Sequence, residues 1–207
     1  MIRFVVFDLG QVLSSPPDLY RTPAALLGVD PDAYEALYWV NRRRYDAGGS
    51  RVEYWQPILE GLDVQPTGEL ISGLATLDAE LWLEPRGAAL DLVNEVYSWG
   101  IKTALLSNAP LVMGKLIRHT EWVGLFDRVF ISAELGLVKP DPEVFAVVTR
   151  ELGVEPAEIA FIDDREPNVI SSRDAGWHSH LWVDDDDSRA WLTQVCGQDR
   201  PGSQAVS

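Results

Sequence analysis

The stretch Phe4-Val-Val-Phe-Asp8-Leu-Gly-Gln-Val-Leu13 places a single aspartate directly after an apolar run. A run such as Ile2 to Phe7 is typical of a strand that is buried on both faces of a parallel sheet. Asp8 then lies at the carboxyl end of that strand, where open α/β sheets bind their ligands. Burying a carboxylate costs free energy unless a cation or hydrogen-bond donors compensate it, so this position predicts a functional site.

The same pattern returns near the other end of the chain, in Phe161-Ile-Asp163-Asp164-Arg-Glu-Pro-Asn168. Here an apolar, strand-like run ends in two adjacent acids. Parallel strands bring their carboxyl ends to one edge of a sheet, so the acids of the two runs are expected to converge. Carboxylate oxygens in such a cluster are suitable ligands for a hard divalent cation.

Length and composition favour an ordinary soluble globular protein. The 207 residues allow one good-sized core with a smaller satellite unit. The net charge of −15 argues against a nucleic-acid partner, because such binding needs clustered Lys and Arg. The single cysteine, Cys196, favours a reducing, cytoplasmic location. We expect no membrane association, because the sequence has neither a signal peptide before the first strand nor an apolar segment of about 20 residues.

Between the first strand and about residue 84, the sequence predicts only helices. A long helix opens with Asp30 as N-cap and Pro31 at its first position, and it carries apolar residues at helical spacing as far as Tyr45. The other helices are expected over residues 18–27, 50–60 and 67–81. We expect Arg42-Arg43-Arg44 on a solvent-facing helix side, with substrate contact as the alternative, and Trp39 and Trp55 are candidates for lining a substrate pocket.

From Glu84 onward, helical and strand patterns alternate, which predicts an α/β fold with a Rossmann-like parallel sheet covered on both faces. Asp141 is expected to cap the helix that starts at Pro142. The predicted organisation is a core domain of residues 1–14 and 85–196, a helical cap domain of residues 15–84, and a C-terminal tail of residues 197–207. Helices are expected over 86–98, 110–119, 142–152, 166–175 and 187–195, and strands over 101–106, 128–131, 158–162 and 178–183.

Four polar positions stand at strand ends or at the start of a helix, within FDLGQV (Asp8), LLSNAP (Ser107), GLVKPDPEVF (Lys139) and FIDDREPN (Asp163 and Asp164). In this order and spacing, they resemble the four motifs of the haloacid dehalogenase-like (HAD) superfamily. The helical insertion after the first strand resembles the C1 cap of one of its subgroups. The forms FDLGxV and FxDD…N are most similar to small sugar-phosphate phosphatases of that superfamily.

This resemblance implies phosphoryl transfer from a small phosphorylated metabolite, with Mg²⁺ as cofactor. Asp8 would be the nucleophile that forms an aspartyl phosphate. The implied metal ligands are the Asp8 carboxylate, the backbone carbonyl of Gly10 and the Asp164 carboxylate, and Asp163 would orient a metal-bound water from outside that first set of ligands.

The remaining motif residues would serve the phosphate and the acid pair. Lys139 would keep Asp8 ionised and neutralise charge on the phosphoryl group. Ser107 and the backbone amide of Asn108 would donate hydrogen bonds to phosphate oxygens. Asn168 would support the loop that carries the acid pair. By this resemblance Asp8, Ser107 and Lys139 form the catalytic set, and Ser107, Asn108 and Lys139 bind the substrate.

One position departs from the resemblance. Most phosphatases of the superfamily carry a second aspartate two residues after the nucleophile as general acid and base, and this chain has Gly10 there. A positioned acid or base is typically worth about 10²–10⁴ in rate. We therefore expect turnover to depend on how readily the leaving group departs.

Two other functions fit parts of the pattern. A metal-independent 2-haloacid dehalogenase would share Asp8, Ser107-Asn108 and Lys139, but such enzymes generally replace the first acid of the fourth motif with a neutral residue. A non-catalytic binding protein on the same fold would explain Gly10. The acid pair favours a metal and therefore a phosphate substrate, whereas the oligomeric state stays open.

Overall fold

A central strand carries the first aspartate. β1 (Phe4–Phe7) is flanked by β2 (Lys102–Ser107) and β4 (Ile159–Asp163), and all pairings are parallel. β3 (Arg128–Ile131) and β5 (His178–Leu181) complete the sheet at its edges, in the order β3-β2-β1-β4-β5. The computed structural model describes residues 1–197. Within them, this order brings the carboxyl ends of β1, β2 and β4 side by side.

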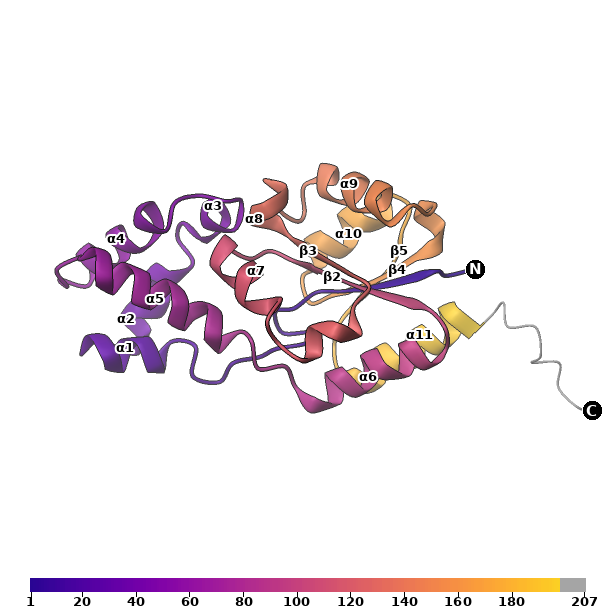
Figure 1. Ribbon diagram of the computed structural model, residues 1–207, viewed down its shortest axis with the longest axis horizontal. Helices are drawn as coiled ribbons and strands as arrows, with labels where there is room; N and C mark the ends of the chain where they lie inside the picture. Colours follow the sequence, from indigo (N-terminus) through magenta and orange to yellow (C-terminus); the bar gives the residue numbers. More distant parts are fainter. Residues whose placement is uncertain (198–207) are drawn as a thin grey trace, which may run out of the picture.

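Helices cover both faces of the sheet (Figure 1). α6 (Gly87–Ser98) and α11 (Asp185–Gly197) lie on one face, and α9 (Pro142–Leu152) and α10 (Glu166–Asp174) lie on the other. Strand residues alternate between these layers, so that Val5 packs into one apolar cluster and Val6 into the second. Both residues are fully buried, which explains the continuous apolar run that precedes Asp8.

The residues between β1 and α6 form a separate helical lobe beside the sheet (Figure 1). Its two connections to the rest of the chain lie next to each other, because the Ser14 hydroxyl donates to the Glu84 carbonyl at 3.0 Å and the Arg86 amide donates to the Leu13 carbonyl at 2.8 Å. The chain therefore enters and leaves the lobe at neighbouring points. The helices of the lobe are α1 (Arg21–Leu27), α2 (Pro31–Tyr38), α3 (Arg42–Asp46), α4 (Arg51–Gly61) and α5 (Gly68–Leu81).

Two short helices of the sheet-bearing part meet this lobe. α5 packs against α7 (Leu111–Ile117), and α3 packs against α8 (Ser132–Leu135). The Ser132 hydroxyl donates to the Asp46 carbonyl at 2.5 Å, which ties the end of α3 to the start of α8. The remaining short helices are η1 (Trp122–Leu125) and η2 (Pro156–Glu158).

The predicted fold class is confirmed, with differences in the helices. The single helix expected from Pro31 to Tyr45 is wrong, since Trp39–Asn41 interrupt it and separate α2 from α3. α8 was not predicted, because its four residues are too few for a periodic pattern. Asp30 does cap α2, accepting from the amides of Asp32 and Ala33.

The C-terminal end of the chain is described only in part. Gly197, where the expected tail begins, is the last residue of α11. The rest of that tail, residues 198–207, lies outside the described residues. Over residues 1–197, no helix is both long enough and apolar enough to cross a bilayer.

Candidate active site

The acids of the two strand ends converge. Asp8, Asp163 and Asp164 each offer one carboxylate oxygen, and these oxygens lie within 4.8 Å of one another. The convergence follows from the register of the sheet, in which Phe7 is opposite Ile162. The Asp8 amide continues this pairing by donating to the Ile162 carbonyl at 3.0 Å. Adjacent parallel strands thus place residues about 155 positions apart at one point.

Lys139 lies in the middle of this cluster and is almost fully buried. Its Nζ is 2.7 Å from Asp8 Oδ1 and 2.6 Å from Asp163 Oδ2, and it donates to the Leu106 carbonyl at 2.9 Å. These three partners use all three protons of the ammonium group. Burial lowers the pKa of Lys139, but the carboxylates of Asp163 and Asp8 raise it by more, so the net shift is upward and the lysine is charged at neutral pH.

The two adjacent acids have different surroundings. Asp163 is fully buried and accepts hydrogen bonds from the Asn168 side chain at 2.8 and 3.0 Å and from the Arg165 amide at 2.8 Å, besides its contact with Lys139. Asp164 is half-buried and takes part in none of the ion pairs found among residues 1–197. Asp163 therefore has its oxygens occupied by protein donors, whereas those of Asp164 can accept a ligand.

The cluster carries more negative than positive charge. Burial raises the pKa of Asp8 to about 7; Lys139 opposes this shift, and Asp163 and Asp164 add to it. Burial likewise raises the pKa of Asp164 to about 6, with Asp163 as a further cause. Three carboxylates face a single ammonium group, so the ionised cluster lacks positive charge. A hard divalent cation with oxygen ligands fits this donor set.

The end of β2 adds hydrogen-bond donors to the same pocket. The Ser107 side chain is buried, lines the pocket and makes no hydrogen bond within the described chain. The Asn108 side chain donates to the Lys139 carbonyl at 2.8 Å and accepts from the Lys139 amide at 2.9 Å. Asn108 thus fixes the backbone of the lysine, a role that its position in the sequence did not reveal.

The loop after β1 leaves backbone amides free. Those of Leu9 and Gly10 donate to no acceptor in the described part of the chain, and the same holds for the amide of Asn108. The Gly10 carbonyl accepts from the Val12 amide at 2.7 Å. A carbonyl oxygen has a second lone pair, so this bond leaves room for one further ligand.

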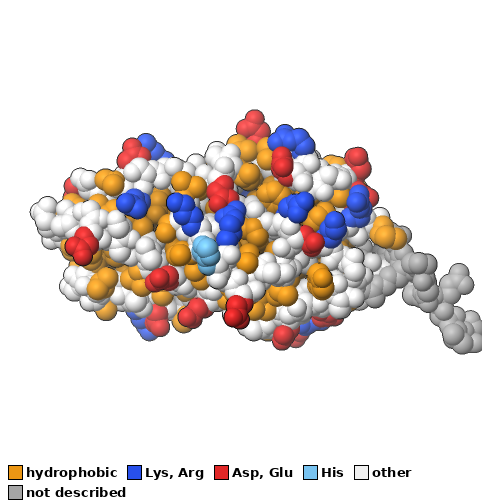
Figure 2. Space-filling model, viewed as in Figure 1, with side chains coloured by type: hydrophobic (Ala, Val, Ile, Leu, Met, Phe, Trp, Pro, Cys, Tyr) orange, Lys and Arg blue, Asp and Glu red, His pale blue; other side chains and the backbone are white. Residues whose placement is uncertain are grey.

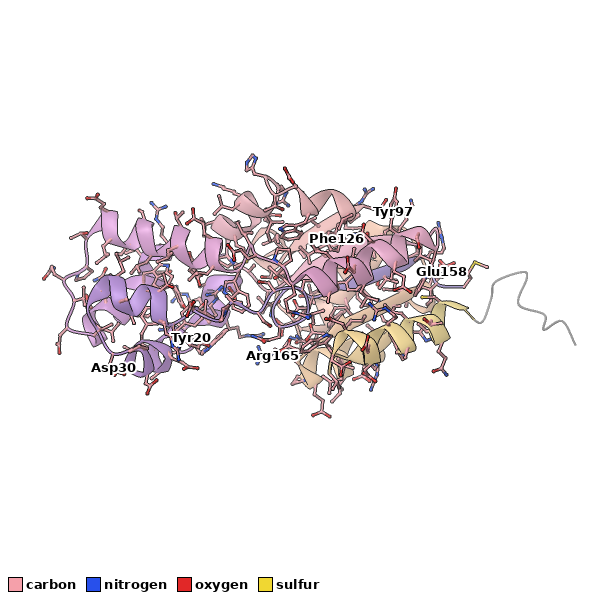
Figure 3. All side chains as sticks on the ribbon, turned by 90° about the horizontal axis from the view of Figure 1, so that it is seen from below. Tyr20, Asp30, Tyr97, Phe126, Glu158 and Arg165 are labelled. Atoms are coloured by element: carbon pink, nitrogen blue, oxygen red, sulfur yellow. The ribbon has the colours of Figure 1, made fainter. Side chains whose placement is uncertain are left out.

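These groups line one pocket of about 530 Å³ between the sheet and the helical lobe. On the face shown in Figure 2, acidic and basic side chains are mixed over both parts of the molecule, whereas the pocket is lined by Asp8 and Asp164 of the acidic cluster. Figure 3 labels a residue on each side of the junction, Tyr20 of the lobe and Arg165 of the sheet-bearing part, and both line the pocket.

The lobe contributes side chains that the sequence placed wrongly. Arg42 was expected toward solvent, but it is 5% exposed and pairs with Asp46 at 2.9 Å and Asp78 at 3.0 Å. Trp55, a candidate for the pocket, lies fully buried inside the lobe, whereas Trp39 does line the pocket. The run Arg42-Arg43-Arg44 gave no sequence signal for this difference, because only Arg42 faces inward.

Asp141 also differs from expectation. Its side chain does not cap α9. Instead, both of its carboxylate oxygens accept from Arg43 Nη2, at 2.7 and 2.8 Å. This ion pair joins the helical lobe to the segment that carries Lys139, two residues earlier.

A family model for haloacid dehalogenase-like hydrolases matches residues 25–176, which is most of the chain. The chain belongs to the haloacid dehalogenase-like hydrolase family. This confirms the resemblance inferred from the four motifs, and it makes the protein an enzyme of the hydrolase class. The match covers Ser107, Lys139 and the acid pair, whereas Asp8 precedes it.

Two relatives add detail about the family. A drimenol cyclase of Aspergillus calidoustus is 26% identical over 204 residues, which cover 95% of this chain and 37% of that protein. Phosphoglycolate phosphatase 1 of Pseudomonas aeruginosa is 25% identical over 186 residues, covering 84% of this chain and 66% of the phosphatase. The chain thus spans less than two thirds of the length of both relatives.

Solved structures share the fold. A HAD family enzyme of Bacteroides thetaiotaomicron, crystallised with magnesium and inorganic phosphate, superimposes with a TM-score of 0.68 at 21% identity. The match covers 88% of this chain and 95% of that one. At this identity, the likeness is evidence for the HAD fold and not for a shared substrate.

Proposed function

We propose that the protein is a Mg²⁺-dependent phosphatase that hydrolyses a small phosphorylated metabolite through an aspartyl phosphate on Asp8. The observation that carries this proposal is the cluster of Asp8, Lys139, Asp163 and Asp164 at adjacent strand ends, with the Asp164 carboxylate outside every protein ion pair described. A phosphatase among the relatives supports it, and so does the magnesium and phosphate bound to a HAD-fold enzyme.

The geometry allows Asp8 to act as nucleophile. Its Oδ1 contacts Lys139, and its other oxygen has no partner within the described chain. That free oxygen attacks phosphorus, the bond from phosphorus to the substrate oxygen breaks, and the departing oxygen takes a proton from water. Water then hydrolyses the aspartyl phosphate, which restores Asp8 and releases inorganic phosphate.

Other side chains hold the phosphoryl group and the nucleophile. Ser107, with the free amides of Leu9, Gly10 and Asn108, offers hydrogen-bond donors to the equatorial oxygens. Lys139 counters the burial of Asp8 and keeps it closer to its ionised form.

The residues that would hold Mg²⁺ are Asp8, Asp164 and the Gly10 carbonyl, with Asp163 and Asn168 behind them. Asp163 fits the outer position because its oxygens already accept from protein donors. When bound, Mg²⁺ supplies positive charge that offsets the carboxylates and the phosphoryl oxygens. The cytoplasmic location expected from the single cysteine belongs to this proposal as well.

Parallel phosphate-release and halide-release assays, each with and without EDTA, test the proposal. We expect phosphate release that EDTA abolishes and Mg²⁺ restores. Asp164→Asn should raise the Mg²⁺ concentration for half-maximal activity by more than the about 10- to 100-fold that is typical for loss of a partner behind the metal ligands. Asp174→Asn, at an exposed acid at the end of α10, is the matched control. Full activity in EDTA would overturn the metal role, and halide release from 2-haloacids without phosphate release would establish the dehalogenase instead.

A further inference from the structure

The position of the missing acid is covered by an aromatic side chain. A Cβ atom built on Gly10 would lie 3.6 Å from Cζ3 and 3.9 Å from Cη2 of Trp82, which is ordinary van der Waals contact. Trp82 follows the last residue of α5, so the helical lobe presents an indole ring to the loop that carries the nucleophile. Where related phosphatases place a carboxylate, this pocket has an apolar wall.

The indole ring of Trp82 is held in place by buried partners. Its Nε1 donates to the Tyr38 hydroxyl at 3.3 Å, and that hydroxyl donates to Asp78 at 2.5 Å. Arg42 contacts both Tyr38 and Asp78. Trp82 itself is 7% exposed. The indole ring of Trp82 is therefore fixed within the folded lobe and does not depend on a mobile side chain.

Further apolar side chains extend this wall. Trp39 donates through its indole NH to the Tyr20 hydroxyl at 2.9 Å, which uses the polar atom of the tryptophan and leaves its rings as the surface. The rings of Trp39 and Tyr20 also pack edge-on against Tyr38, with centroid distances of 4.8 and 5.7 Å. The apolar residues that the pocket receives from both parts of the molecule include Leu19, Tyr20, Trp39, Trp82 and Met113.

The cationic side chains on the lobe side of the pocket are already paired. Arg42 is bonded to Asp46 and Asp78, and Arg43 holds both oxygens of Asp141. Asp46 keeps one carboxylate oxygen without a partner in the described chain. Whether it is protonated or ionised, this carboxyl group has no positive charge and does not attract an anion. A second acidic group of a substrate would have to displace a carboxylate from these lobe arginines. The sheet-bearing part adds one further cationic side chain to the pocket, Arg165, which takes part in none of the ion pairs found among residues 1–197.

We propose that Trp82, Trp39 and Tyr20 form the subsite for a hydrophobic leaving group, so that the substrate is the phosphate monoester of an apolar alcohol. This inference rests on the proposed phosphatase function and narrows its substrate class. It disfavours sugar phosphates, whose hydroxyls would lie unpaired against indole rings, and phosphorylated acids, whose carboxylate would have to compete with the carboxylates that already pair with the lobe arginines.

A panel of primary alkyl phosphates tests the inference at nearly constant leaving-group basicity. We expect kcat/KM for hexyl phosphate to exceed that for methyl phosphate, glucose 6-phosphate and phosphoglycolate, each by about 10-fold or more. Equal or faster turnover of glucose 6-phosphate or phosphoglycolate would overturn it. No phosphate release from any member, nor from 4-nitrophenyl phosphate, would instead overturn the phosphatase proposal.

Variants assign the preference to the wall. Trp39→Ala should lower the ratio of kcat/KM for hexyl over methyl phosphate by about 10-fold, whereas Trp82→Phe, which keeps an aromatic ring, should lower it less. Tyr97→Ala is the matched control, because Tyr97 is an exposed aromatic residue of α6 that does not line the pocket. An unchanged ratio in Trp39→Ala, with its circular dichroism and melting intact, would show that the wall does not bind the leaving group.

Discussion

The molecule buries two clusters of charged side chains, and they differ in what they leave open. The strand-end cluster of Asp8, Lys139, Asp163 and Asp164 keeps free oxygens on Asp8 and Asp164. The lobe cluster consists of Arg42, Asp46, Asp78 and Tyr38, and most of its polar atoms bond to one another. The first cluster can therefore bind ligands, whereas the second mainly holds structure. Burial of charge alone therefore does not mark an active site. The two clusters differ in how many unpartnered oxygens they present to the pocket, and the lobe cluster presents only one from the described chain, on Asp46.

The sharpest contrast between the clusters should come from Asp8→Asn. An amide at this position cannot attack phosphorus, so phosphate release should fall by about 10⁴-fold or more. Because burial raises the pKa of Asp8, a neutral side chain is tolerated there and the fold should persist. Steady-state kinetics and thermal melting check both parts. Residual activity above about a hundredth of the native rate would mean that another group is the nucleophile.

In the lobe cluster, we expect a substitution to lower the stability of the fold. Asp78→Asn leaves Arg42 buried with one fewer charge partner, which should lower the free energy of unfolding by about 3–5 kcal/mol. Urea denaturation measures this loss. Arg44→Ala is the control, because its ion pair with Glu53 is exposed and should contribute less than about 1 kcal/mol. Equal losses in the two variants would contradict the structural role given to Asp78.

Gly10 lies where the loop after β1 meets the helical lobe, because a Cβ atom built on it would contact Trp82. Without an acid there, kcat/KM should rise as the pKa of the leaving group falls, and Gly10→Asp should speed the poorest leaving groups by about 10²-fold. Phosphate monoesters of graded leaving-group pKa measure this slope before and after the change. A flat slope in the native enzyme, with chemistry rate-limiting, would show that another residue supplies the proton.

The smallest expected effect is the change in stability with pH that Asp46 causes. Burial raises the pKa of Asp46 to about 6, with Arg42 opposing. The folded chain then holds this proton more tightly than the unfolded chain, so Asp46 lowers the free energy of unfolding as pH rises from about 4 to 6. Asp46→Asn should remove that decline, so that the free energy of unfolding of the native protein falls relative to that of the variant by on the order of 2 kcal/mol between pH 4 and pH 7. Urea denaturation across this range measures it, and a constant difference between the two proteins would contradict it.

The sequence predicted the strand-end cluster because its signals are local and strong. A buried strand followed by an acid limits the fold to few alternatives, and the parallel pairing of β1 with β4 then brings Asp8 to Asp163. The same reasoning placed each strand within a few residues. Asp30 and Pro31 likewise predicted the start of α2 correctly, because a cap depends only on neighbouring residues.

The lobe cluster could not be predicted in this way. Arg42 lies between Asn41 and Arg43 in a polar run, and only its tertiary partners Asp46 and Asp78 account for its burial. Asp141 precedes a helix as a cap residue would, yet its carboxylate pairs with Arg43 from the lobe. Contacts between distant helices leave no periodic signal, and the aromatic wall around Trp82 depends on such contacts.

The central position of β1 also sets the order in which the molecule can assemble. Phe4 pairs with Lys102 and with Ile159, so both partner strands of β1 are synthesised only after the whole helical lobe. The helices of the lobe make contacts that are closer in sequence and can form earlier, whereas non-local strand pairing is slow. A nascent chain that ends before residue 163 already contains Asp8 and Lys139 but neither acid of the second strand end. In a chain synthesised from its N-terminus, the cluster of Asp8, Lys139, Asp163 and Asp164 can thus be completed only after the whole lobe has been made.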